Sequence, residues 1–85
     1  MKYRLVYTHR AFKDIRKLED NVKQRIGKVL KEYKEEPLKY ASKLIDPALG
    51  TYRFRIGDYR VIFDIKGEEL IVLRVGHRKD IYRKL

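Results

Sequence analysis

"YRFRIGDYRVIF", residues 52–63, joins two runs of alternating apolar residues through a central Gly57-Asp58 pair. Two such runs around a two-residue loop with glycine predict a β-hairpin in which Arg55 lies opposite Arg60. Side chains alternate between the two faces of a sheet, so one face receives the apolar residues and the other receives Arg53, Arg55 and Arg60. The stretch therefore predicts an apolar face and an arginine face.

Like charges placed directly opposite each other destabilise a sheet. One explanation is a solvated, charged face that discourages edge-to-edge aggregation. The other is an anionic ligand that binds to the arginines. The hairpin by itself leaves both explanations open.

The part of the chain before the hairpin predicts a strand followed by a helix. Residues 2–7, "KYRLVY", have the composition of a strand. Thr8 is a suitable N-cap for a helix over residues 9–20. Three apolar residues of this helix have helical spacing, and we expect them to pack in the core: Phe12, Ile15 and Leu18.

A second helix follows at once. Asn21 and Gln24 have the spacing of a capping box at its start. Its apolar stripe consists of Val22, Ile26, Val29, Leu30 and Tyr33. Gly27 within it costs about 1 kcal/mol of helix propensity, which close packing against the first helix would explain. Pro37 is expected to end the second helix. Because only a short link of two to three residues separates the two helices, we expect them to form an antiparallel hairpin.

After the second helix, residues 38–50 form a connection with turns. The hairpin's second strand runs on to Ile65, and Lys66-Gly67 forms the next turn. Residues 70–76, "LIVLRVG", are apolar on both faces apart from one arginine, so they predict a central strand. Residues 77–85 are too short for an independent helix and predict one helical turn.

The order β-α-α-β-β-β predicts an α+β fold with a mainly antiparallel sheet, a helical hairpin on one face and a short C-terminal helical turn. The 85 residues are expected to form a single domain, 1–85. The chain contains no cysteine and no apolar run long enough for a membrane span, and its start does not resemble a signal peptide. We therefore expect a cytoplasmic protein without disulfides or contact with a membrane.

The strongest global signal is a net charge of +10 at pH 7. It predicts an anionic partner, such as RNA, DNA or an acidic protein. Residues 1–50 carry nine lysines and four arginines, whereas residues 51–85 carry three lysines and six arginines. Arginine binds phosphate through a planar, bidentate fork, so this switch indicates that the C-terminal part is the binding surface.

Several kinds of site are excluded or disfavoured. The sequence has no glycine-rich phosphate loop of the standard patterns, and neither His9 nor His77 has a second ligand at metal spacing. We expect no metal and no cofactor. The residues that remain could hold a phosphate and stabilise its transition state. They are Arg53, Arg55, Arg60, His77, Arg78 and Tyr82.

Together these features resemble the RelE/ParE toxin superfamily of toxin–antitoxin systems, on the RelE side. The resemblance covers nearly the whole chain. It includes the element order, the pair Lys43-Leu44, the stretch "YRFRIGDYRVIF" and the ending "VGHRKDIY". "GHR" followed closely by tyrosine is its most specific part.

The resemblance implies a ribosome-dependent endonuclease that cleaves mRNA in the ribosomal A site by attack of the 2′-oxygen on the adjacent phosphate. It also implies an acidic, RelB-like antitoxin as partner. Arg60 and Arg78 would stabilise the transition state, and Tyr82 would orient the nucleophile or move its proton.

The remaining implied roles concern phosphate contact and the base. Arg53, Arg55 and Lys43 would contact phosphate. Relatives have lysines at the positions of Arg53 and Arg55, and arginine is a poor base. Nearby arginines favour a neutral imidazole, so His77 becomes the candidate base. Three alternatives stay open: a ParE-like gyrase inhibitor, a non-catalytic RNA-binding or antitoxin-binding module, and an inactivated toxin.

Overall fold

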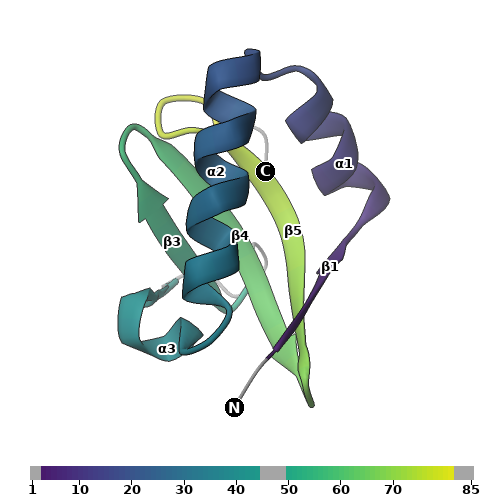
Figure 1. Ribbon diagram of the computed structural model, residues 1–85, viewed down its shortest axis with the longest axis vertical. Coiled ribbons are helices and arrows are strands. Elements are labelled where there is room, and N and C mark those ends of the chain that lie inside the picture. Colours follow the sequence, from purple (N-terminus) through teal and green to yellow (C-terminus); the bar gives the residue numbers. More distant parts are fainter. Residues whose placement is uncertain (1–2, 45–49, 82–85) are drawn as a thin grey trace.

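The computed structural model describes residues 3–44 and 50–81, which form one five-stranded sheet and three helices. The strands are β1 (Arg4–Tyr7), β2 (Ser42–Lys43), β3 (Tyr52–Ile56), β4 (Tyr59–Lys66) and β5 (Glu69–His77). The helices are α1 (His9–Arg16), α2 (Asp20–Tyr33) and α3 (Pro37–Tyr40). In the sheet order β1-β5-β4-β3-β2, only β1 and β5 pair in parallel (Figure 1). The predicted α+β class, mainly antiparallel sheet and central strand are confirmed.

The hairpin has the predicted register. Arg55 pairs with Arg60, and Phe54 pairs with Val61. The turn Gly57-Asp58, which we call the hairpin tip, contains Gly57 at φ +61°, a left-handed conformation that glycine adopts without steric cost. Local turn chemistry and alternation were therefore sufficient to define this element.

The core lies between the helices and one face of the sheet (Figure 1). The sheet contributes Phe54, Ile56, Val61, Phe63, Leu70, Val72 and Val75, and the helices contribute Ala11, Ile26 and Leu30. The rings of Phe54 and Phe63 stack with their centroids 4.2 Å apart. Burial of these side chains, at about 25 cal/mol per Å² of apolar area, holds the helices on this face.

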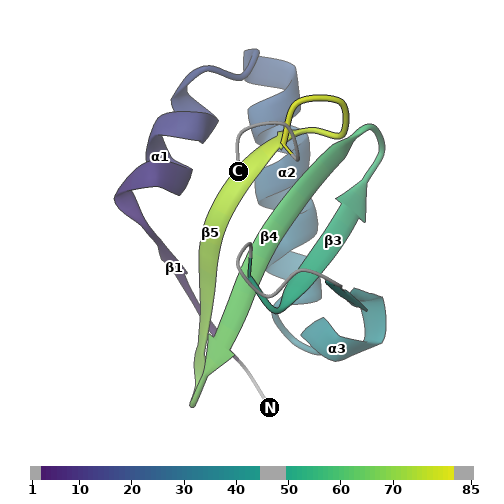
Figure 2. The ribbon, with the colours of Figure 1, turned by 180° about the vertical axis from the view of Figure 1, so that it is seen from behind.

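The opposite face, which Figure 2 shows, carries the arginines of the hairpin. Ile62 on this face is nevertheless completely buried. Gly50 covers it so closely that a Cβ at Gly50 would approach Ile62 Cγ2 to 2.7 Å. Further along, Ile81 is 2% exposed and lies in van der Waals reach of a Cβ built on Gly76. The segment before the hairpin, at Gly50, and the segment after β5, at Ile81, thus each pack against the arginine face through a short apolar contact.

The first helix begins as predicted. Thr8 is its N-cap, and the Thr8 hydroxyl accepts a hydrogen bond from the Ala11 amide at 3.1 Å.

The capping box predicted for the second helix is wrong. Glu19 is the N-cap residue, and the Asn21 side chain instead accepts from the Val22 amide at 2.9 Å. The N-cap of the second helix thus lies two residues before the predicted one, Asn21.

Pro37 does not end the second helix, which already ends at Tyr33. Pro37 instead begins α3, a position that suits proline because a first-turn amide has no partner within its helix. The ring of Tyr40 in α3 stacks on that of Tyr33 at 4.1 Å between centroids. The connection predicted over residues 38–50 therefore contains α3 and the edge strand β2.

Gly27 does not mediate close helix packing, because a Cβ there would meet no atom within 4 Å. It lines an apolar groove of about 260 Å³ together with Tyr7, Phe12, Ile15, Leu18, Lys23, Ile26 and Leu30. Phe12, expected in the core, is 53% exposed at this groove. No helix in the described part of the chain is long and apolar enough to cross a membrane.

Candidate functional site

The site is built around the hairpin tip, where Arg55 and Arg60 lie opposite each other on the arginine face. The Arg60 side chain turns back over the tip. Its Nη1 donates to the carbonyl oxygens of Gly57 and Tyr59, both at 2.9 Å. These neutral acceptors fix the guanidinium of Arg60 without cancelling its charge. The repulsion between Arg55 and Arg60 expected from the sequence therefore remains, and a bound anion would relieve it.

Arg78 is brought to the same turn by the chain that follows β5. Its amide donates to the Asp58 carbonyl at 2.7 Å, and its Nε lies 3.5 Å from Asp58 Oδ1. Both side chains are more than half exposed, so this ion pair is weak and screened by solvent. The backbone bond, rather than the ion pair, fixes where Arg78 leaves the sheet.

The end of β5 is held in place by α1. Asp14 accepts from Arg74 Nε at 2.7 Å, from Arg74 Nη2 at 3.3 Å and from the Val75 amide at 3.0 Å. The Thr8 hydroxyl donates to the Leu73 carbonyl at 3.2 Å. Because β1 pairs with β5 only as far as Val72, α1 supplies hydrogen-bond partners for the edge of β5 beyond that point.

His77 does not lie on the arginine face. It pairs with Tyr59 in the sheet, and the two rings meet edge to face at 5.4 Å between centroids. A bulge causes this. Phe63 pairs with Val72, but Ile62 pairs with Arg74. The extra residue reverses the faces of the rest of β5, so His77 moves to the helix side of the sheet.

The Lys79 amide donates to His77 Nδ1 at 3.1 Å. In a neutral imidazole one nitrogen carries the proton and the other accepts, so this bond favours the tautomer with the proton on Nε2. Such a ring presents a donor to the solvent. In this tautomer Nε2 cannot accept a proton, so the general-base role of His77, which stays a prediction, requires the other tautomer.

The remaining predicted residues are further from the tip. Arg53 pairs with Ile62 and Ser42. It lies on the arginine face, two residues before Arg55 in β3 and so further from the tip. Lys43 pairs with Tyr52, whose ring stacks against the core, so the register separates Lys43 from the arginine face. Tyr82 lies outside the described residues.

Arg25 is the residue that sequence reasoning missed. It lies on α2, and its Nη1 and Nη2 are each 2.9 Å from the position that a Cβ on Gly57 would occupy. Figure 1 shows the first half of α2, the turn between β3 and β4 and the chain after β5 at the same end of the molecule. No sequence motif links Arg25 to the hairpin. The available signal was its position next to Ile26, a residue of the apolar stripe that is buried against the sheet.

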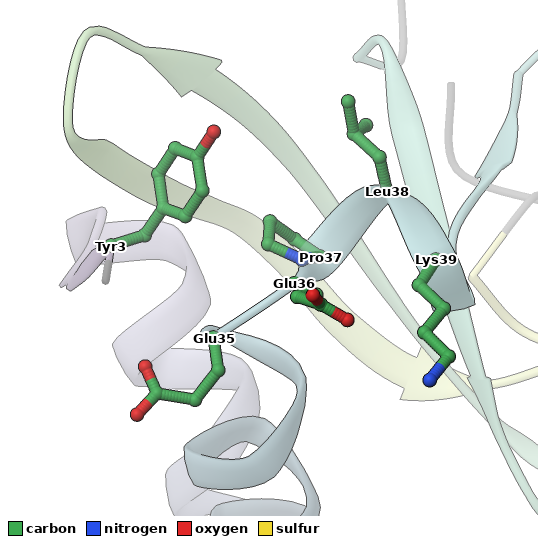
Figure 3. Close-up of a pocket in the computed structure, with 6 residues that line it drawn as sticks. All are labelled: Tyr3, Glu35, Glu36, Pro37, Leu38 and Lys39. Carbon is green, nitrogen blue, oxygen red and sulfur yellow. The ribbon is translucent and has the colours of Figure 1, made fainter. Parts of the chain in front are cut away.

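The surface has one hollow next to this site and a larger one away from it. One of about 300 Å³ contains Tyr59, His77 and Asp80 in its lining, next to the tip. A larger hollow of about 440 Å³ lies at the junction of α2 and α3 (Figure 3). It is lined by Tyr3, Glu35, Glu36, Pro37, Leu38 and Lys39. Its two carboxylates disfavour an anionic ligand, so its size does not make it the site.

The arrangement at the tip can bind a phosphate and stabilise extra negative charge on it, because arginine remains protonated throughout such a reaction. Among residues 3–44 and 50–81, no three histidine, aspartate or glutamate side chains converge to hold a metal ion.

The sequence matches known toxins over almost its full length. Residues 5–82 match the family described as the ParE toxin of the type II toxin–antitoxin system parDE. Toxin RelG of Mycobacterium tuberculosis is 32% identical over 87 residues, which cover 99% of this chain and 100% of the relative. Toxin RelE3 of Methanocaldococcus jannaschii is 29% identical, with 93% of this chain and 94% of the relative covered.

Solved structures show the same fold. The toxin–antitoxin complex RelBE2 from Mycobacterium tuberculosis contains a chain with a TM-score of 0.82 and 27% identity, covering 92% of this chain and 100% of that one. The RelE–RelB complex from Pyrococcus horikoshii gives 0.74 and 25%, covering 94% and 99%. The extent of these matches and the arginine-lined hairpin tip place the chain in the RelE/ParE superfamily of type II toxin–antitoxin toxins.

Proposed function

We propose that this toxin is a ribosome-dependent endonuclease that cleaves mRNA in the A site, and that it acts in the cytoplasm. The observation that carries the proposal is the meeting of Arg60 and Arg78 at one turn. Arg60 keeps its full charge because neutral carbonyls hold it, and Arg78 can leave its solvent-exposed carboxylate partner for a phosphate at little cost.

The RNA supplies the nucleophile. The 2′-oxygen attacks the adjacent phosphorus, the bond from phosphorus to the 5′-oxygen breaks, and a 2′,3′-cyclic phosphate and a 5′-hydroxyl result. The 2′-hydroxyl loses its proton to a base, and the leaving 5′-oxygen gains one from an acid. Arg60 and Arg78 stabilise the pentavalent intermediate electrostatically, while Arg55 and Arg53 contact flanking phosphate.

The proton-transfer roles follow from the tautomer of His77. With Nδ1 accepting from the Lys79 amide, Nε2–H is a hydrogen-bond donor, which fits a hydrogen bond to an RNA oxygen. The role of base then falls to another group, and Tyr82 is the remaining candidate from the family resemblance.

The partner that controls the toxin is an acidic, RelB-like antitoxin. The structural relatives from Mycobacterium tuberculosis and Pyrococcus horikoshii are complexes of toxin with antitoxin. A net charge of +10 on 85 residues favours fast encounter with an acidic, partly disordered chain.

One observation favours a second function. The family description that matches residues 5–82 is that of the ParE toxin, and a ParE-like protein would inhibit DNA gyrase without cutting RNA. The arginines at the hairpin tip, together with the "GHR" that resembles the RelE side of the superfamily, favour mRNA cleavage instead, because arginines gathered at one turn suit the binding of a phosphate.

Induced expression of the full chain, with growth, translation, mRNA ends and DNA damage followed together, separates the two. We expect growth arrest with mRNA cuts in phase with codons. Arg60→Ala and Arg78→Ala should each abolish arrest while the far-UV circular dichroism stays unchanged, because exposed arginines contribute little to stability. Arg10→Ala on α1, away from the tip, is the control and should stay toxic.

Arrest with DNA damage and intact mRNA would instead establish the gyrase function. If cells never arrest, the chain is a binding module or an inactive toxin. Full toxicity of both arginine variants would show that the hairpin tip is not the active site.

A further inference from the structure

Arg25 reaches the hairpin tip from a different element than the other arginines. Its guanidinium lies beside the position that a Cβ on Gly57 would occupy. The carbonyl oxygen of the same glycine accepts a hydrogen bond from Arg60. Two cationic groups therefore bracket one glycine, from the helix and from the sheet. The glycine supplies the positive φ of the turn, and its lack of a side chain leaves the space that the guanidinium of Arg25 occupies.

The charge at the tip is unbalanced. Asp58 supplies a carboxylate at the turn, and it pairs with Arg78. None of the ion pairs among residues 3–44 and 50–81 includes Arg25 or Arg60. Four arginines, Arg25, Arg55, Arg60 and Arg78, therefore surround a turn whose own carboxylate is that of Asp58.

Arginines gathered at one turn repel one another, and contact with solvent screens this repulsion. Holding an arginine side chain in one place loses rotamer entropy, and placing it near other cations adds repulsion. An anion at the tip offsets both, and more than one phosphate can take part because the cations come from opposite sides of the turn.

We propose that Arg25 is an RNA-binding residue of this toxin: it contacts a phosphate next to the one that Arg60 and Arg78 hold, so the RNA backbone crosses the hairpin tip toward α2. The inference rests on the proposed function in taking RNA as the ligand. Arg25 binds a flanking phosphate and not the reacting one, so its role is in binding and not in catalysis. Its loss raises KM and leaves kcat unchanged.

The test compares Arg25→Ala and Arg25→Lys with the parental chain and with Lys28→Ala. Lys28 is the matched control, because it is an exposed cation on the same helix, three residues further on. The probe is a fluorescent single-stranded RNA whose 2′-hydroxyls are methylated, so binding is measured without cleavage. Affinity is measured over a range of salt concentrations, and cleavage is measured on programmed ribosomes.

Arg25→Ala should weaken binding about tenfold, as expected for one charge-assisted phosphate contact. It should also lower the slope of log affinity against log salt by about 0.7, the value for one contact to a single strand. Arg25→Lys should restore the slope, and Lys28→Ala should keep the parental one. A purely structural Arg25 would change the melting temperature without changing the slope.

An unchanged slope for Arg25→Ala, or an equal loss for Lys28→Ala, overturns the role of Arg25 even if the parental toxin cleaves mRNA. If the parental toxin binds the RNA through Arg25 but cuts nothing on ribosomes, the proposed endonuclease fails and the Arg25 contact stands. If the parental toxin does not bind the RNA at all, the inference is refuted.

Discussion

Replacing Asp14 by alanine should strongly destabilise the toxin, because one carboxylate holds both Arg74 and the edge of β5. The change removes three hydrogen bonds, to Arg74 Nε at 2.7 Å, to Arg74 Nη2 at 3.3 Å and to the Val75 amide at 3.0 Å. The side chains of Asp14 and Arg74 are only 15% and 17% exposed.

The magnitude follows from this burial. Removing one partner of a fully buried pair costs about 3–5 kcal/mol, whereas an exposed pair is worth about 0.2–1 kcal/mol. With some 15% of the side chains in contact with solvent, we expect a loss near the lower end of the buried range, about 3 kcal/mol. In a domain of this size that lowers Tm by roughly 12–24 °C.

Urea unfolding followed by circular dichroism measures the change, with Arg74→Ala and the double variant completing a double-mutant cycle. Asp20→Ala is the control. Asp20 is 95% exposed and lies 3.8 Å from Lys23, so its loss should leave the denaturation midpoint nearly unchanged. A cost for Asp14→Ala as small as that for Asp20→Ala, or additive effects of Asp14 and Arg74, would refute the reasoning.

Three further predictions concern the helix cap at Thr8, the roles of His77 and Tyr82, and the antitoxin partner. Thr8→Ala removes the N-cap bond to Ala11 and the bond to Leu73, and urea unfolding should show a loss of about 1–2 kcal/mol; Thr8→Ser should recover most of it. His77→Gln keeps a donor and should retain single-turnover cleavage within about tenfold, whereas Tyr82→Phe should lose much more if the hydroxyl transfers the proton; a larger loss for His77→Gln would restore the base assignment. Association with the cognate antitoxin should slow steeply as salt rises, since charge steers the encounter; an on-rate indifferent to salt would contradict this.

Much of the fold could be read from the sequence because its signals are local. The alternation in residues 52–63 and the glycine at their centre determine the hairpin register, and the structure has that register. Thr8 at the start of α1 is a signal of the same kind. The errors at Asn21 and Pro37 are also local. A capping residue and a helix-starting proline can each suit two neighbouring positions, and packing selects one.

The sequence by itself determined the family motifs, the basic charge and the presence of arginines at positions 55, 60 and 78. Only the tertiary structure decided which side chains share the site. A single extra residue in β5 moves His77 to the helix side, and long-range packing brings Arg25 from α2 onto Gly57. Both depend on contacts between segments far apart in the chain. Local periodicity encodes the face of a residue within its own element, but neither a bulge nor the docking of a helix on a turn.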